Sequence, residues 1–119
     1  MSFLYSFKNF VKEFFEINNI KENVPRSTIF PHRTGIIIAS GSIIGENCRI
    51  YQNVTIGRRN LRSTFDLPTI GNNVTIFAGA CILGKIRVGD NAVIGANTVI
   101  VKDVKENQVI FNKEKEVLK

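Results

Sequence analysis

Large aliphatic side chains recur at every sixth position of this chain between residues 38 and 100, with one slip of two positions across residues 57–69. The residue two places before each of them is small or apolar, and side chains at i−2 and i of a strand point to the same side. This period predicts short buried strands and is incompatible with a helix. The aliphatic positions are Ile38, Ile44, Ile50, Ile56, Ile70, Ile76, Ile82, Val88, Ile94 and Ile100.

Turn-forming residues follow the same period. Glycine directly follows several of the aliphatic positions, and asparagines stand where the chain must turn, namely at Asn47, Asn73, Asn91 and Asn97. Both residue types tolerate unusual backbone conformations. Three six-residue units close one triangular coil, and paired hairpin turn signals are absent. The pattern therefore predicts a mainly β protein, a parallel β-helix shaped as a triangular prism, with a projecting loop at about 57–69.

The first part of the chain has a different pattern. Phe3, Phe7, Phe10 and Phe14 recur at helical spacing, with lysines and glutamates on the other side. We expect a short amphipathic helix in an N-terminal cap of residues 1–24, followed by a β-helix domain of residues 25–119. The helix either packs on the prism or on a neighbouring subunit, or residues 3–17 make a weak contact with a membrane surface.

Composition narrows the classes of function. The chain has 119 residues and a net charge of +6, but its basic residues are scattered and no recognition motif accompanies them, so we expect no nucleic-acid partner. Cys48 and Cys81 lack metal-ligand spacing, which predicts reduced thiols and no metal site. No signal peptide or membrane-spanning stretch is evident, and a cytoplasmic location is expected.

Three motifs carry a more specific resemblance. They are P-H-x-x-G-I-x-I at residues 31–38, I-x-Q-x-V-T-I-G at 50–57 and A-G-A-x-I-L-G at 78–84. Over residues 30–104 the chain resembles the serine acetyltransferase-like branch of the hexapeptide-repeat acyltransferases, which includes capsule and O-antigen sugar acetyltransferases. The resemblance implies a left-handed β-helix, acetyl-CoA as co-substrate, and a homotrimer with active sites between subunits.

His32, the single histidine, occupies the position of the family's general base. An imidazole that titrates near neutral pH can accept the proton of an acceptor hydroxyl and pass it to the departing CoA thiolate. The resemblance implies further roles around it. Cofactor-binding residues would be Ala78, Gly79 and Ala96 along the pantetheine arm, with Lys102 and Lys105 at the CoA phosphates; substrate-binding residues would be Thr34, Gln52, Arg58 and Arg59.

For the small residues, a purely structural role at coil corners is the alternative. For the lysines and the loop arginines, the alternative is solvated surface.

The chain also departs from serine acetyltransferases proper. Leu67 stands where they carry a second histidine, and Ile17 where they carry a carboxylate partner of the first. Their C-terminal G-x-P-A-K segment is replaced by FNKEKEV at 111–117. We therefore expect an O-acetyltransferase acting on a sugar hydroxyl in surface polysaccharide biosynthesis. The alternatives are a serine O-acetyltransferase of cysteine biosynthesis and a non-catalytic β-helical scaffold.

Overall fold

The computed structural model describes residues 24–112, which form eleven strands of two or three residues each. The expected helix within residues 3–17 lies outside the described residues, as does most of the proposed N-terminal cap. The strands are β1 (Ile37–Ile38), β2 (Ile43–Ile44), β3 (Arg49–Ile50), β4 (Thr55–Gly57), β5 (Thr69–Ile70), β6 (Thr75–Ile76), β7 (Cys81–Leu83), β8 (Arg87–Val88), β9 (Val93–Ile94), β10 (Val99–Ile100) and β11 (Val109–Ile110).

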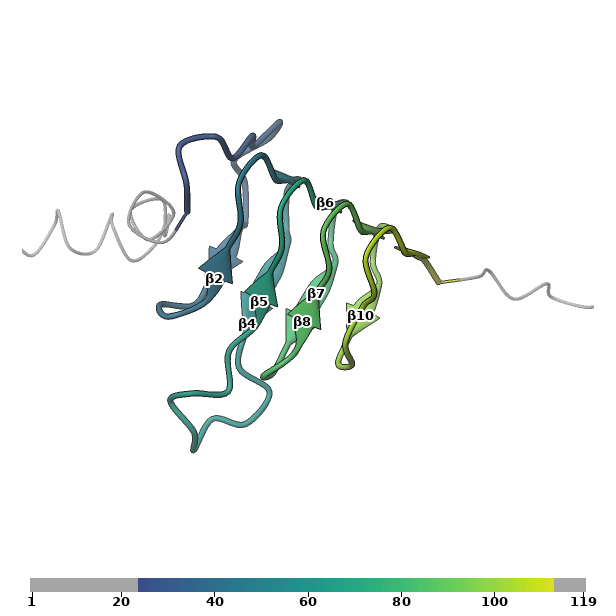
Figure 1. Ribbon diagram of the computed structural model, residues 1–119. Coiled ribbons are helices and arrows are strands. Elements are labelled where there is room, and N and C mark those ends of the chain that lie inside the picture. The colour runs from purple at the N-terminus through teal and green to yellow at the C-terminus, as the bar shows by residue number, and fades with distance from the viewer. Residues whose placement is uncertain (1–23, 113–119) are drawn as a thin grey trace, which may run out of the picture.

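The strands stack into three parallel sheets, which are the faces of a prism (Figure 1). Face I consists of β1, β4, β7 and β10, face II of β2, β5 and β8, and face III of β3, β6, β9 and β11. The chain visits the faces in the order I, II, III and returns to I one coil further on. Each strand therefore pairs with strands of the neighbouring coils, as β4 does with β1 and β7. The predicted parallel β-helix is confirmed.

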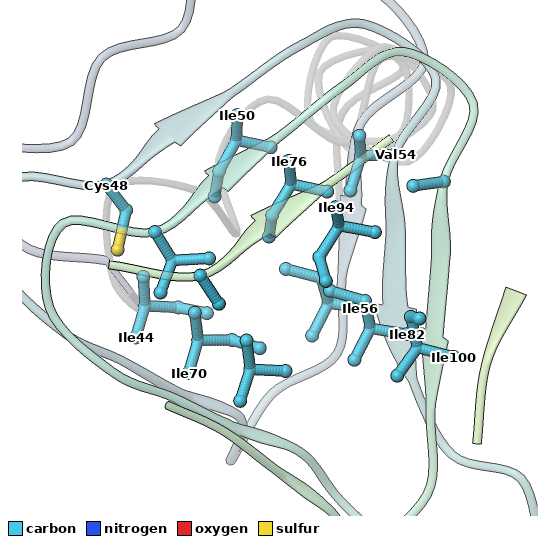
Figure 2. Close-up of a cluster of buried hydrophobic side chains, with 14 of the residues drawn as sticks. Ile44, Cys48, Ile50, Val54, Ile56, Ile70, Ile76, Ile82, Ile94 and Ile100 are labelled. Carbon is cyan, nitrogen blue, oxygen red and sulfur yellow. The ribbon is translucent and has the colours of Figure 1, made fainter. Parts of the chain in front are cut away.

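The core is the set of aliphatic residues that the period predicts. All ten of these side chains are buried. Figure 2 shows two of the rows that they form, Ile50, Ile76 and Ile94 in one and Ile56, Ile82 and Ile100 in the other. The residues two places earlier complete the interior and are buried as well, except Ile86, which is only partly buried. Burial of each large aliphatic side chain contributes roughly 1.5–3 kcal/mol.

The corners between faces depend on left-handed backbone conformations. Six asparagines have φ near +60°: the predicted Asn47, Asn73, Asn91 and Asn97, together with Asn53 and Asn107. Asparagine enters this region more readily than other residues with a Cβ. Four of them form one column between faces II and III, where the main chain of each coil hydrogen-bonds to the next, for example from the Asn73 N–H to the Glu46 carbonyl at 2.8 Å.

The slip in the period marks a loop. β4 ends at Gly57 and β5 begins at Thr69, and the eleven intervening residues project from the prism between faces I and II (Figure 1). The loop predicted at 57–69 is therefore present as residues 58–68.

Candidate active site at one corner of the prism

Four of the predicted site residues lie in one column. Thr34, Gln52, Ala78 and Ala96 occupy equivalent positions in successive coils where the chain turns from face III to face I, which we call corner III/I. The column is tied together by the main chain: the N–H groups of Asn53, Gly79 and Asn97 donate to the carbonyls of Thr34, Gln52 and Ala78 at 2.9, 3.0 and 2.9 Å. These hydrogen bonds align the residues in a line of small or polar side chains along the prism. Successive members are about 4.8 Å apart, the usual spacing of adjacent strands.

The column has only small side chains where the resemblance places the pantetheine arm. Gly79 has a φ of +75° and faces the side-chain amide of Asn97, so a side chain at this position has no room. The carbonyl of Ala78 is used by the ladder, whereas the N–H groups of Ala78 and Ala96 donate to no backbone group within residues 24–112. These two groups are available to a ligand that lies along the corner.

His32 lies at the same corner, in the first coil. Ile29 pairs with Arg49 of the second coil. The Thr34 carbonyl accepts a hydrogen bond from the N–H of Asn53, the residue after Gln52. Five positions therefore separate Ile29 from Thr34, against three from Arg49 to Gln52. This corner is longer by two residues, and His32 is exposed on the extension. Its imidazole forms no hydrogen bond with residues 24–112, and Ile17, at the position of the family's carboxylate partner, lies outside them.

The loop arginines lie at a different corner. Arg58 and Arg59 begin the loop between faces I and II, which we call corner I/II, so face I separates them from the column within one chain. Arg59 is exposed, while the Nε atom of the half-buried Arg58 is enclosed without a hydrogen-bond partner among the described residues.

Asp66 fastens the loop to the prism. Its carboxylate accepts the N–H groups of Arg59 and Asn60, at 2.9 and 2.6 Å, and that of Lys85 in the next coil at 2.9 Å. These hydrogen bonds, led by the one from Asn60, lower the pKa of Asp66 below its ordinary value. The next residue, Leu67, lies against Gly41 of the preceding coil. The loop therefore leaves the prism in a defined direction.

The two lysines are also away from the column. Lys102 is exposed at corner I/II, and Lys105 is exposed between faces II and III. Within one chain the two side chains are thus at different corners from each other and from Ala78 and Ala96.

Residues 68–102 match the family model described as bacterial transferase hexapeptide (six repeats). A serine acetyltransferase of Synechococcus elongatus is 44% identical over 73 residues, which are 61% of this chain and 30% of that protein. This chain contains a hexapeptide-repeat segment and is similar to the serine acetyltransferases. It spans about a third of the length of the curated relatives it matches.

Solved structures agree. A serine acetyltransferase of Neisseria gonorrhoeae in complex with serine superposes with a TM-score of 0.72 at 30% identity, covering 92% of this chain and 49% of that one. A serine acetyltransferase in complex with CoA has a TM-score of 0.62 at 40% identity, covering 69% of this chain and 33% of that one. The expected resemblance and the left-handed β-helix are therefore confirmed.

Between residues 24 and 112, no helix is long and apolar enough to cross a membrane. Across the same residues, no three His, Cys, Asp or Glu side chains gather in a way that could hold a metal ion.

The sequence interpretation missed a row of aromatic side chains beside the column. Tyr51 and Phe77 directly precede Gln52 and Ala78, and their rings stack with centroids 5.0 Å apart and an interplanar angle of 25°. The signal was present in the spacing, because Tyr51 and Phe77 are separated by the same number of residues as Gln52 and Ala78.

Proposed function

We propose that this chain is an acetyl-CoA-dependent O-acetyltransferase whose active site is corner III/I. The observation that carries the proposal is the single column of Thr34, Gln52, Ala78 and Ala96, with His32 in the first coil of the same corner. The relatives are named serine acetyltransferases, and one of the similar structures is a complex with CoA. The pantetheine arm would lie along Ala78, Gly79 and Ala96, with the thioester toward His32.

His32 supplies the acid–base chemistry. Its imidazole takes the proton of the acceptor hydroxyl as the oxygen attacks the thioester carbonyl carbon. When the tetrahedral intermediate collapses, the carbon–sulfur bond breaks and the imidazolium gives the proton to the CoA sulfur. The new ester then leaves with the acetyl group. Because His32 is exposed on its extended corner, it can approach both substrates.

The acceptor favoured by the comparisons is L-serine, because the relatives are serine acetyltransferases and one neighbouring structure is a complex with serine. The comparisons do not support our expectation of a polysaccharide acceptor. A sugar hydroxyl remains the second candidate on one observation: Leu67, where serine acetyltransferases proper carry a histidine, lies against Gly41 in the base of the loop.

The assembly we propose is a homotrimer that buries face I. Its outward-facing positions are Ile37, Thr55, Cys81 and Val99, a row without charge, whereas Arg49 and Arg87 face outward on the other two faces. A threefold axis parallel to the prism brings corner III/I of one copy beside corner I/II of the next. Arg58, Arg59 and Lys102 would then reach a neighbour's column, as the resemblance requires.

The free thiols of Cys48 and Cys81 support a reducing, cytoplasmic location.

Transfer of isotope-labelled acetyl from acetyl-CoA tests the proposal. The acceptor pool contains L-serine, nucleotide sugars and surface oligosaccharides, and products are read by mass spectrometry. His32→Ala should remove transfer and leave CoA binding intact, while Arg33→Ala, an exposed neighbour on the same corner, should stay active. Label on serine or on a sugar identifies the acceptor. Unchanged transfer in a folded His32→Ala variant refutes the role of His32, and absence of both transfer and CoA binding leaves a β-helical scaffold.

A further inference from the structure

The aromatic row beside the column continues to the end of the described chain. Ile76 pairs with Ile94, and Ile94 pairs with Ile110. The residues that follow them, Phe77, Gly95 and Phe111, therefore lie in one row in successive coils. The row runs parallel to the column of Ala78 and Ala96, one residue away from it, and it is interrupted at Gly95.

The two phenylalanine rings on either side of this interruption are accessible. Phe77 is 38% exposed, and Tyr51 stacks on it from the preceding coil. The second face of the Phe77 ring is therefore on the side of Gly95. Phe111, two coils from Phe77, is 65% exposed.

Phe111 is exposed, but its backbone is held on both sides. The Gly95 N–H donates to the Ile110 carbonyl at 2.7 Å, and the Asn112 Nδ2 atom donates to the Asn97 carbonyl at 2.8 Å. A methyl group on Gly95 would lie 2.6 Å from the Phe111 Cβ atom, so Phe111 packs against the backbone of Gly95 and only glycine fits at this position of the row. The arrangement presents two exposed aromatic side chains on backbones that hydrogen bonds between coils hold in place, with no side chain at Gly95 between them.

We propose that Phe77 and Phe111 bind the adenine ring of CoA between them, over Gly95. The inference rests on the proposed function for the identity of the ligand. Two coil spacings separate the Cα atoms of the two phenylalanines by about 10 Å, which leaves room for one planar ring in contact with an aromatic side chain on each side. Flat bases stack favourably on such side chains.

The position along the prism agrees with the length of the ligand. His32 is in the first coil and Phe111 in the fifth, so about 19 Å separates them along the axis at the usual strand spacing. The adenine is at the opposite end of CoA from the thioester, and the pantetheine arm between them would pass Ala78 and Ala96. Phe111 is also the first residue of the segment that replaces the family's G-x-P-A-K sequence.

Calorimetric binding of adenosine 3′,5′-bisphosphate to the full chain tests the adenine contact without acyl transfer. Phe111→Ala and Phe77→Ala should each weaken this binding, and that of CoA, about tenfold, the scale of one base–aromatic stack. Phe111→Trp should keep it. Val109→Ala, which shortens another exposed side chain of β11, is the matched control and should bind as the wild type does. Thermal unfolding verifies that each variant is folded.

A second readout separates adenine recognition from general damage. S-acetylpantetheine lacks the adenosine moiety, so its kcat/KM should be unchanged in Phe111→Ala while the KM for acetyl-CoA rises. Equal loss with both donors, unchanged CoA affinity, or a loss in Val109→Ala as well would overturn the proposal. So would a Phe111→Ala effect that is confined to the oligomeric mass, since the row would then be a contact between copies.

The two proposals fail in different ways. If adenosine bisphosphate binding depends on Phe111 but no acetyl group is transferred, the adenine site stands and the proposed activity falls. If acetyl transfer proceeds and neither phenylalanine affects CoA binding, the activity stands and the adenine site falls. A wild-type chain that binds neither CoA nor adenosine bisphosphate overturns both.

Discussion

Gly35 lies directly against the side-chain amide of Asn53 in the next coil, in contact across corner III/I. Gly35 has a φ of +66°. The Asn53 N–H donates a hydrogen bond to the carbonyl of Thr34, the residue before Gly35, at 2.9 Å. The backbone three residues after His32 is thus held by the second coil. Whatever disturbs this contact also moves the extension that carries His32.

Gly35→Ala should destabilise the protein and reduce acetyl transfer. The new methyl group collides with Asn53, and alanine is strained at this φ, so we expect a loss of roughly 2 kcal/mol in the free energy of unfolding. Urea denaturation and the acetyl-transfer assay measure the two effects. Gly57→Ala is the control, because a methyl group there is 3.7 Å from its nearest neighbour, the Ala39 Cβ atom. Equal stability of the two variants would contradict the prediction.

Ile76→Ala should cost about 2–5 kcal/mol of unfolding free energy, because it leaves a cavity in the row between Ile50 and Ile94 (Figure 2). Thr75→Ala changes the adjacent, outward-facing residue of β6 and should stay within about 0.5 kcal/mol of the wild type. Chemical denaturation of both variants provides the comparison. A small loss for Ile76→Ala would mean that the coils collapse around the cavity.

Asp66→Asn should free the loop of residues 58–68. The variant loses a carboxylate that accepts three backbone N–H groups, so trypsin should cleave after Arg59 and Arg62 several-fold faster. Asp103→Asn is the control, since Asp103 accepts one N–H, from Arg87 at 2.9 Å, at the same corner. Cleavage at the wild-type rate in Asp66→Asn would show that other contacts hold the loop.

Acid should release the same loop in the wild-type protein. The folded-state pKa of Asp66 is lowered by its hydrogen bonds from the backbone, so its stabilising effect is fully present above the ordinary pKa near 4 and is lost as the pH falls through the lower folded value. Protection of the Arg59, Asn60 and Lys85 amides from exchange, followed by NMR, should be constant near neutral pH and decline only in strong acid. A decline beginning near pH 6 would point to another group.

Thr55→Lys should dissociate the proposed trimer. Thr55 is on the uncharged outward row of face I, and burying an unpaired ammonium in an interface is strongly unfavourable. Thr75→Lys places the same charge on face III of the same prism and should leave the assembly intact. Light scattering coupled to gel filtration measures the masses. If only Thr75→Lys produces monomers, face III is the interface.

The placement of site residues depended on more than their motifs. The resemblance named Thr34, Gln52, Ala78 and Ala96, but the three spacings between them are 18, 26 and 18 residues because the loop is inserted after Gln52. Their alignment in one column follows from the hydrogen bonds between coils. The same stacking puts Arg58, Lys102 and Lys105 at other corners, which no local pattern indicates.

The sequence by itself determined the prism, its interior and its loop. The information within each six-residue unit is local in the sequence. Alternating side chains select the buried positions, and glycine or asparagine permits the turn. The period can therefore be recognised without knowing which units are neighbours. Only the tertiary structure decided which residues meet at a corner, how the extended first corner exposes His32, and that Phe77 and Phe111 lie on either side of Gly95. These relationships arise because register between coils is set by main-chain pairing of segments that are far apart in the sequence.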